Sequence, residues 1–239
     1  MASEQPLNGQ SALITGASRG IGLAVARRLG QMGARVAICA RDSKRLEVAS
    51  AMLTREEIQN LALAADVSRA SEVSALVEAA LKSFGALDIL VNNAGIGRFA
   101  PLHEFTEADW DALLDTNLKG VFLMSRAVIP GMISRRRGHI INISSLAGKN
   151  SFAGGSVYCA SKWGLLGLTY SMAEDLRGYG IRIAAICPGS VATEFSPHPG
   201  KKMANILQPD DVAHAVAMIL TEAPQSFISE VLLRPTQKP

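Results

Sequence analysis

The stretch TGASRGIG, residues 15–22, follows a short apolar run and precedes a helical pattern through Ala24, Val25 and Leu29. Glycines let the backbone turn tightly and approach a pyrophosphate, whose charge is met by free N–H groups and by the positive end of the helix. The spacing is G-x3-G-x-G rather than G-x-G-x-x-G. The stretch therefore predicts a strand, a glycine turn and a helix that together bind phosphate.

Outward from this turn, short apolar runs alternate with helical patterns along the chain. The runs cover residues 12–14, 36–39, 61–64, 89–91, 139–143, 181–187 and 231–233. Strands that are apolar along their whole length need helices on both faces, as in buried parallel sheets. We expect an α/β fold in one Rossmann-type, doubly wound domain over residues 1–239, with a seven-stranded parallel sheet and helices on both faces.

Residue spacing predicts where helices lie. One apolar stripe, which predicts a helix, consists of Val73, Leu76, Val77, Ala80, Leu81 and Phe84. A second helix is expected after an N-cap at Thr106, with an acid at Asp109. Its apolar face would hold Trp110, Leu113, Leu114, Leu118 and Val121, interrupted by Asn117. Residues 188–209 contain four prolines and few periodic apolar positions, so we expect a loop there, with 189–208 as a short substrate loop.

Composition excludes several classes of protein. The 239 residues are 48% hydrophobic and 19% charged, which argues against disorder and collagen. The net charge of +3 is too small to predict a nucleic-acid or membrane partner. The first residues, MASEQPLNGQ, lack a signal-peptide pattern, and no window reaches about 18 uninterrupted apolar residues. We therefore expect a cytoplasmic protein.

The cysteines and histidines show no metal-ligand spacing. Cys39, Cys159 and Cys187 are odd in number and form no C-x-x-C pair, and the four histidines lie far apart. We expect neither disulfides nor a metal site, with the three thiols packed as small hydrophobic groups.

Further segments follow the glycine turn in a fixed order: Asp66-Val67, Asn92-Asn93-Ala94-Gly95, Asn117, Ser145, Tyr158, Lys162 and Pro188-Gly189. With them the chain, from about Leu7 to Leu233, resembles the short-chain dehydrogenase/reductase family, and most of all its 3-oxoacyl-[acyl-carrier-protein] reductase branch. The resemblance implies cofactor contacts from Gly16, Ser18, Arg19, Gly20, Ile21, Gly22, Arg41, Asp66, Val67, Asn93, Ala94, Gly95, Tyr158, Lys162, Pro188, Gly189, Val191 and Thr193.

Tyr158 and Lys162 are four residues apart in a helical pattern over residues 156–176, so both point from one helix face. A tyrosine hydroxyl has an ordinary pKa of about 10, and an adjacent ammonium favours its ionised form. We therefore expect Lys162 to lower the pKa of Tyr158 and so make its hydroxyl usable in proton transfer.

Two polar residues complete the expected catalytic set. Ser145 follows the apolar run 139–143, at the end of the sheet where open parallel sheets bind ligands. Its neighbour Ser144 has the same chemistry, and the choice of Ser145 rests on the family's serine-to-tyrosine interval. The resemblance implies that Asn117 binds water in a proton relay, whereas as a plain buried amide it would need other partners.

The second apolar run ends with Ala40 and Arg41. NAD-preferring relatives place an acid at the position of Ala40, and nothing here repels a 2′-phosphate. Arg41 and Arg19 can pair with that phosphate, which predicts NADP(H) as the cofactor. The alternative is that Asp42 folds back onto the ribose, which would favour NAD(H).

The substrate expected from the resemblance is a carbonyl compound, reduced by hydride transfer. The best candidate is a 3-oxoacyl thioester on an acyl carrier, and Arg135 to Arg137 or Lys201-Lys202 could meet an acidic carrier, although solvated charge is the plainer interpretation. The ending Ile228 to Pro235 departs from the Asp-Gly-Gly-like turn of that branch, which puts the substrate and the assembly in doubt. A homo-oligomer, either a dimer or a tetramer, is still expected.

Two alternatives remain at this point. One is a broad NADPH-dependent carbonyl reductase, or an alcohol dehydrogenase working in the oxidative direction. The other is a dinucleotide sensor without catalysis, which would be expected to lack at least one proton-handling residue.

Overall fold

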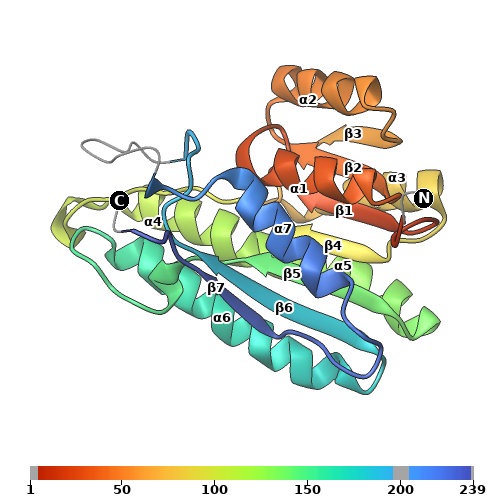
Figure 1. Ribbon diagram of the computed structural model, residues 1–239. Coiled ribbons are helices and arrows are strands. Elements are labelled where there is room, and N and C mark those ends of the chain that lie inside the picture. Colours follow the sequence, from red (N-terminus) through yellow and green to blue (C-terminus); the bar gives the residue numbers. More distant parts are fainter. Residues whose placement is uncertain (1–4, 196–204, 238–239) are drawn as a thin grey trace.

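The computed structural model describes residues 5–195 and 205–237. In these ranges seven strands form one parallel sheet in the order β3-β2-β1-β4-β5-β6-β7 (Figure 1). The strands are β1 Ser11–Thr15, β2 Arg35–Ala40, β3 Asn60–Ala64, β4 Ile89–Asn92, β5 Gly138–Ile143, β6 Ile181–Pro188 and β7 Glu230–Leu233. This confirms the α/β fold class and the seven-stranded parallel sheet predicted from the apolar runs.

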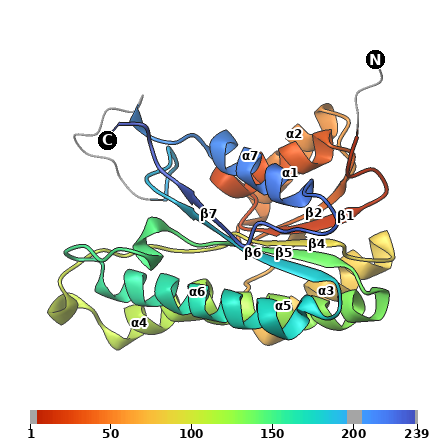
Figure 2. The same cartoon turned by 60° about the horizontal axis from the view of Figure 1, so that its bottom comes forward.

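Helices cover both faces of the sheet (Figure 2). One face carries α1 Gly20–Gln31, α2 Ser43–Arg55 and α7 Pro209–Leu220. The other carries α3 Ala70–Phe84, α4 Glu107–Leu114, α5 Gly120–Arg135 and α6 Ser156–Arg177. Two hydrophobic cores result, one on each side of the sheet, because the strand side chains point alternately to the two faces.

The strand order changes direction between β1 and β4. From this point β2 and β3 extend to one side, and β5, β6 and β7 extend to the other. The loops after β1 and β4 therefore diverge and leave a crevice at the carboxyl ends of the strands, where open α/β sheets bind ligands. This crevice holds the candidate site.

The segment between Thr106 and Arg135 differs from the single helical pattern expected at its start. Thr106 and Asp109 form the predicted capping box. After α4, however, a π-helical turn at Asp115–Lys119 precedes α5 and shifts the helical phase. Asn117 is buried, at 1% exposure, whereas Trp110 is 42% exposed. The expected apolar face was therefore wrong for Trp110, and Asn117 belongs to the buried side.

The arginine run lies far from the crevice. Arg135 ends α5 and donates to the Leu87 carbonyl, and Arg137 pairs with Asp88 at 3.3 Å. Both partners precede β4, so these arginines lie at the amino ends of the strands, opposite the crevice. Lys201-Lys202 lies outside the described residues.

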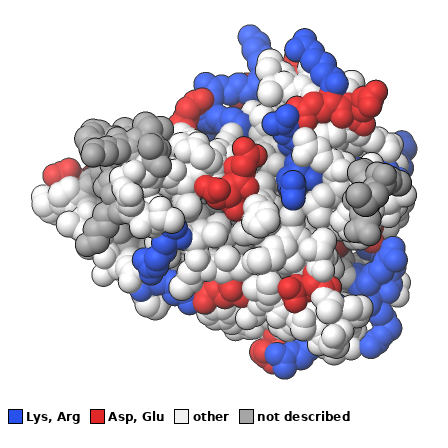
Figure 3. All heavy atoms as spheres, viewed as in Figure 1, with Lys and Arg blue, Asp and Glu red and all other residues white. Residues whose placement is uncertain are grey.

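The surface shows mixed charge, and on the face seen in Figure 3 basic and acidic side chains are interspersed. Cys39, Cys159 and Cys187 are buried free thiols. Within residues 5–195 and 205–237, no helix has the length and apolar character needed to cross a membrane.

Candidate active site

The glycine turn packs tightly against the loop after β4. Gly16 has a φ of +66°, and a Cβ there would lie 2.8 Å from the Ala94 Cα. A Cβ on Gly22 would lie 2.4 Å from the Gly16 carbonyl oxygen. The Asn93 amide donates to the Thr15 and Gly16 carbonyls at 2.9 and 3.1 Å and so fixes the turn. Only glycine fits these two positions without displacing backbone.

A cleft of about 1620 Å³ runs from this turn across the carboxyl ends of the strands. It brings together most of the sequence-predicted site residues: Gly16, Ser18, Arg19, Gly20, Ile21, Arg41, Asp66, Val67, Asn93, Ala94, Gly95, Ser145, Tyr158, Lys162, Pro188, Gly189, Val191 and Thr193. Two predicted residues lie behind its wall. Gly22 packs beneath the turn, and Asn117 lies behind Gly95.

One end of the cleft is rich in arginine. Arg19 and Arg45 both form ion pairs with Glu194, Arg45 at a distance of 3.2 Å. Arg41 is exposed and lines the same region. Asp42 instead caps α2, where it accepts a hydrogen bond from the Arg45 N–H at 3.1 Å. The carboxylate that could have bound a ribose hydroxyl is thus engaged in the helix cap.

Asp66 and Val67 form the adjoining wall. The Asp66 carboxylate accepts hydrogen bonds from the N–H and the hydroxyl of Ser68 at 3.0 and 2.7 Å. Burial raises its pKa, but these two hydrogen bonds and the nearby Arg41 and Arg69 leave the pKa below its ordinary value. Asp66 is therefore an ionised hydrogen-bond acceptor at neutral pH.

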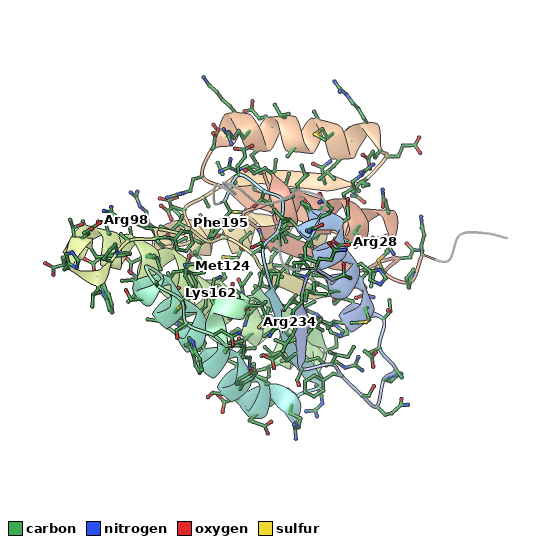
Figure 4. The ribbon with its side chains drawn as sticks, turned by 60° about the vertical axis from the view of Figure 1, so that its left-hand side comes forward. Arg28, Arg98, Met124, Lys162, Phe195 and Arg234 are labelled. Atoms are coloured by element: carbon green, nitrogen blue, oxygen red, sulfur yellow. The ribbon has the colours of Figure 1, made fainter. Side chains whose placement is uncertain are left out.

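Tyr158 and Lys162 leave α6 toward the same side, as their spacing predicts. The Lys162 Nζ lies 5.8 Å from the centre of the Tyr158 ring and donates to the Ile143 carbonyl at 3.0 Å. Lys162 is 5% exposed, and burial lowers its pKa to about 8. Figure 4 shows Lys162 inside the molecule, in the same central region as Phe195.

The pKa of Tyr158 is shifted in the direction opposite to the one predicted. Burial raises it to about 12, although a hydrogen bond with the Ser145 side chain lowers it in part. Desolvation of the phenolate is the largest cause, and Lys162, which donates to the Ile143 carbonyl, is not among the groups that lower the pKa of Tyr158. The protein's own groups hold Tyr158 in its protonated form at neutral pH.

The two neighbouring serines have different surroundings. Ser145 lies close enough to the Tyr158 hydroxyl to lower its pKa, and it accepts a hydrogen bond from the Ala147 N–H at 3.1 Å. Ser144 is 4% exposed, and its hydroxyl donates to the Lys162 carbonyl at 3.4 Å. The geometry therefore favours Ser145 over Ser144, a choice that residue chemistry alone left open.

Asn117 has protein partners on both ends of its amide. Its Oδ1 accepts from the Ile96 N–H at 2.8 Å, and its Nδ2 donates to the Ile96 carbonyl at 2.9 Å and to the Ser161 Oγ at 3.2 Å. These bonds satisfy a buried amide. They also join the loop after β4 to α6, next to Lys162.

The segment after β6 closes the opposite side of the cleft. Gly189 donates its N–H to the Leu233 carbonyl at 2.9 Å, which ties the end of β6 to β7. Val191 forms a bridge with Leu207, and Thr193 lies over the glycine turn, 3.2 Å from where a Cβ on Gly20 would be. The expected substrate loop is described only up to Phe195 and again from residue 205.

Sequence reasoning missed two groups of cleft residues. Arg45 and Glu194 meet across about 150 residues of chain, and no local pattern predicts such an ion pair. Phe99, Phe152 and Phe195 line the cleft around Tyr158. Each is a single aromatic residue in an irregular segment, so only the fold brings them together.

Comparisons with known proteins agree with this architecture. A family model described as short chain dehydrogenase matches residues 10–203. A metagenomic short-chain oxidoreductase solved in complex with NADP is 48% identical, with a TM-score of 0.86, and the match covers 97% of this chain and 99% of that one. A 3-oxoacyl-[acyl-carrier-protein] reductase of Staphylococcus aureus is 37% identical over 89% of this chain and 91% of its own length.

A third relative is much longer. Glycine betaine reductase ATRR of Emericella nidulans is 34% identical over 98% of this chain, but the match spans only 19% of that protein. The glycine turn, the cleft across the carboxyl ends of the strands and the family match over most of its length show that this chain belongs to the short-chain dehydrogenase family.

Proposed function

We propose that this protein is an NADP(H)-dependent oxidoreductase that reduces a substrate carbonyl to a hydroxyl, with Tyr158, Ser145, Lys162 and Asn117 as its active-site residues. The observation that carries the proposal is the meeting of Tyr158, Ser145 and Lys162 at one wall of the cleft. A non-catalytic sensor would not need all of these groups, so the enzyme is the better supported function.

The cleft residues fit a dinucleotide. The glycine turn leaves no room for a Cβ, and the first turn of α1 has no side-chain cap, so its N–H groups are available to phosphate oxygens. Arg19, Arg41 and Arg45 supply cations for a 2′-phosphate, and Asp42 is engaged in the α2 cap. These features, together with the NADP carried by the metagenomic relative, favour NADP(H) over NAD(H).

The chain's own residues would act on the carbonyl oxygen, while the reduced cofactor supplies the hydride. Hydrogen bonds from the Ser145 and Tyr158 hydroxyls would stabilise negative charge as it develops on that oxygen. Tyr158, kept protonated by burial, would then donate its proton to the oxygen. Lys162 would hold ribose hydroxyls, and Asn117 would fix the loop at Ile96 that borders the site.

For the substrate we propose 3-oxoacyl thioesters as the first class to test, because 3-oxoacyl-[acyl-carrier-protein] reductases are among the similar proteins. Free ketones are the second class. They are favoured by the apolar rings of Phe99 and Phe195, which pack against Tyr158 in the cleft.

The test is NADPH oxidation, followed by absorbance, with acetoacetyl thioesters and simple ketones. Turnover with any of them supports the reductase. Tyr158→Phe is expected to slow turnover by about 100- to 10,000-fold. It should still bind NADPH, which fluorescence titration would measure. A protein that binds NADPH but reduces no carbonyl compound would instead be a sensor, and full activity in Tyr158→Phe would remove this residue from the mechanism.

We also propose a homo-oligomer whose contact surface is the outer side of α4, α5 and α6. Trp110, Phe122 and Trp163 are 42%, 45% and 52% exposed there, beside an apolar groove formed by Leu114, Leu118 and Leu168. A second copy would cover this exposed apolar surface by two-fold symmetry. Light scattering after size-exclusion chromatography should show a dimer or tetramer, and Trp163→Glu should reduce its mass. An unchanged mass in Trp163→Glu would place the contact elsewhere.

We propose one domain over residues 1–239, supported by the single sheet, and a cytoplasmic location, supported by the three free thiols.

A further inference from the structure

Three phenylalanines line the mouth of the cleft, and two of them contact the Tyr158 ring. The centres of Phe99 and Tyr158 are 5.3 Å apart with an interplanar angle of 75°, an edge-to-face contact. Phe195 lies 5.9 Å from Tyr158 on another side, and Phe152 lies 5.9 Å from Phe99. We use the name aromatic wall for Phe99, Phe152 and Phe195.

The aromatic wall is exposed although it is apolar. Phe99, Phe152 and Phe195 are 42%, 47% and 41% exposed, whereas Tyr158 beneath them is only 8% exposed. Three large apolar side chains from three separate loops thus face one cavity, next to the candidate proton donor. Contiguous exposed apolar surface of this kind marks a place where a ligand binds.

Two glycines allow the rings to pack in this way. A Cβ on Gly97 would lie 2.9 Å from a Phe195 ring carbon and 3.1 Å from a Phe99 ring carbon. A Cβ on Gly155 would lie 2.5 Å from the Phe152 ring. A larger residue at either position would shift a ring of the wall from the place that it has here.

The neighbouring charge is directed away from the wall. Arg98 follows Gly97 in the chain, but its guanidinium pairs with Asp109 and lies 5.5 Å from the centre of the Phe105 ring. In Figure 4 Arg98 lies toward the left-hand end of the molecule, whereas Phe195 lies near the centre. The part of the substrate that contacts the wall is therefore expected to be uncharged.

We propose that the aromatic wall binds an aromatic substituent on the carbonyl carbon of the substrate, so that the enzyme prefers aryl ketones. The inference rests on the proposed carbonyl reduction. With the carbonyl oxygen at Tyr158 and Ser145, a substituent on the carbonyl carbon is within reach of rings that contact Tyr158 directly. Aromatic rings gain edge-to-face contacts that alkyl groups lack, each worth roughly 2- to 13-fold in an equilibrium constant.

Two kinds of substrate carry an aryl-substituted carbonyl: a free aryl ketone and a 3-aryl-3-oxoacyl thioester, which carries it at its keto end. The panel is therefore acetophenone, cyclohexyl methyl ketone and butanone as free ketones, and benzoylacetyl and acetoacetyl thioesters as carried ones. Cyclohexyl methyl ketone matches acetophenone in size and lacks the aromatic ring. Comparing the free with the carried aryl compound shows which source the enzyme uses.

The expected result is a kcat/KM for the aryl compound about 30-fold above that of its methyl analogue, and several-fold above that of the cyclohexyl ketone. Phe152→Leu should reduce the preference for the aryl compound over butanone by about 10-fold, mainly through the KM of the aryl compound. Phe152 is exposed, so the substitution should not disturb folding, which a thermal melt verifies. Tyr179→Leu, an exposed aromatic at the end of α6, is the matched control.

The outcomes separate the two proposals. If no carbonyl compound consumes NADPH, the proposed function fails. If butanone or acetoacetyl thioester is reduced as well as the aryl compounds, or if Phe152→Leu leaves the aryl preference unchanged, the carbonyl reductase stands and the aromatic wall is not the substrate contact.

Discussion

Asn117 and Ile96 are joined by two hydrogen bonds, one in each direction, from the Ile96 N–H to Oδ1 at 2.8 Å and from Nδ2 to the Ile96 carbonyl at 2.9 Å. The pair holds the loop at Ile96, which borders the cleft, against the π-helical turn at Asp115–Lys119. Irregular helical turns of this kind often lie at functional sites. Here the turn holds a buried amide whose two ends both bond to the Ile96 backbone.

Asn117→Ala should remove both bonds and leave the Ile96 backbone groups without these partners. The expected loss is about 1 to 3 kcal/mol in the free energy of unfolding, with a lower kcat because the loop beside Lys162 is no longer fixed. Denaturant unfolding and steady-state kinetics would measure the two effects. Asn150→Ala, which removes an exposed hydrogen bond, is the control. Unchanged unfolding in Asn117→Ala would contradict the positioning role.

Lys162→Met should raise stability while it reduces turnover. The buried ammonium has a pKa lowered from 10.5 to about 8, which corresponds to a cost of about 3 kcal/mol in its charged form. The lost hydrogen bond to Ile143 offsets about 1 kcal/mol of the gain. This cost is complete below pH 8 and disappears toward pH 10.5, because the folded protein then loses the proton before the unfolded chain does.

Thermal melts of the Lys162→Met variant between pH 7 and pH 10.5 test this sign. The gain in stability of the variant over the original protein should become smaller as the pH rises. Lys119→Met, at an exposed lysine, should show neither effect. A variant that is less stable at every pH would mean that Lys162 contributes more through packing than it costs through burial.

His139 should make the fold sensitive to acid. Burial, and secondly the charge of Arg182, lower its pKa from 6.5 to about 4. The unfolded chain therefore binds a proton before the folded one does, and stability is complete above pH 6.5 and falls between pH 6.5 and 4. The loss is at most about 3 kcal/mol. In His139→Leu the free energy of unfolding should change less with pH over this range. His103→Leu, at an exposed histidine, should show the same pH dependence of stability as the original protein.

Glu194→Gln should improve NADPH binding. The Glu194 carboxylate pairs with Arg19 and Arg45, two of the cations proposed for the 2′-phosphate. Arg19 and Glu194 are 49% and 66% exposed, so removing the charge should lower the KM for NADPH by only about 2- to 5-fold. The KM for NADH should change less, and added salt should reduce the difference. Glu56→Gln, which breaks the Arg27 pair, is the control, and equal effects on both cofactors would contradict this role.

Local sequence patterns predicted most of the fold. The seven apolar runs all became strands, because a buried parallel strand is apolar over its whole length. The helix that begins after Thr106 was only partly predicted. A π-helical turn changes the phase by one residue, and a 3.6-residue pattern cannot show where this happens.

The candidate site was predictable where a motif carries it. The glycine turn and the Tyr158 and Lys162 pair lie in short segments with fixed spacing, and the structure brings them to one cleft. The pKa of Tyr158 was not predictable, because it depends on burial by Phe99 and Phe195 from other loops. The ion pair of Arg45 and Glu194 was not predictable either, because only the tertiary structure brings these two residues together.

Glu194 and Phe195 are consecutive residues that face different partners. One pairs with Arg19 and Arg45, and the next packs against the Tyr158 ring. A single peptide bond thus connects the arginine-rich end of the crevice with the wall at Tyr158. Substitutions of Glu194 that aim to change cofactor preference should therefore also be tested for altered ketone selectivity, and substitutions of Phe195 for altered cofactor preference, because the two side chains are neighbours on one backbone segment.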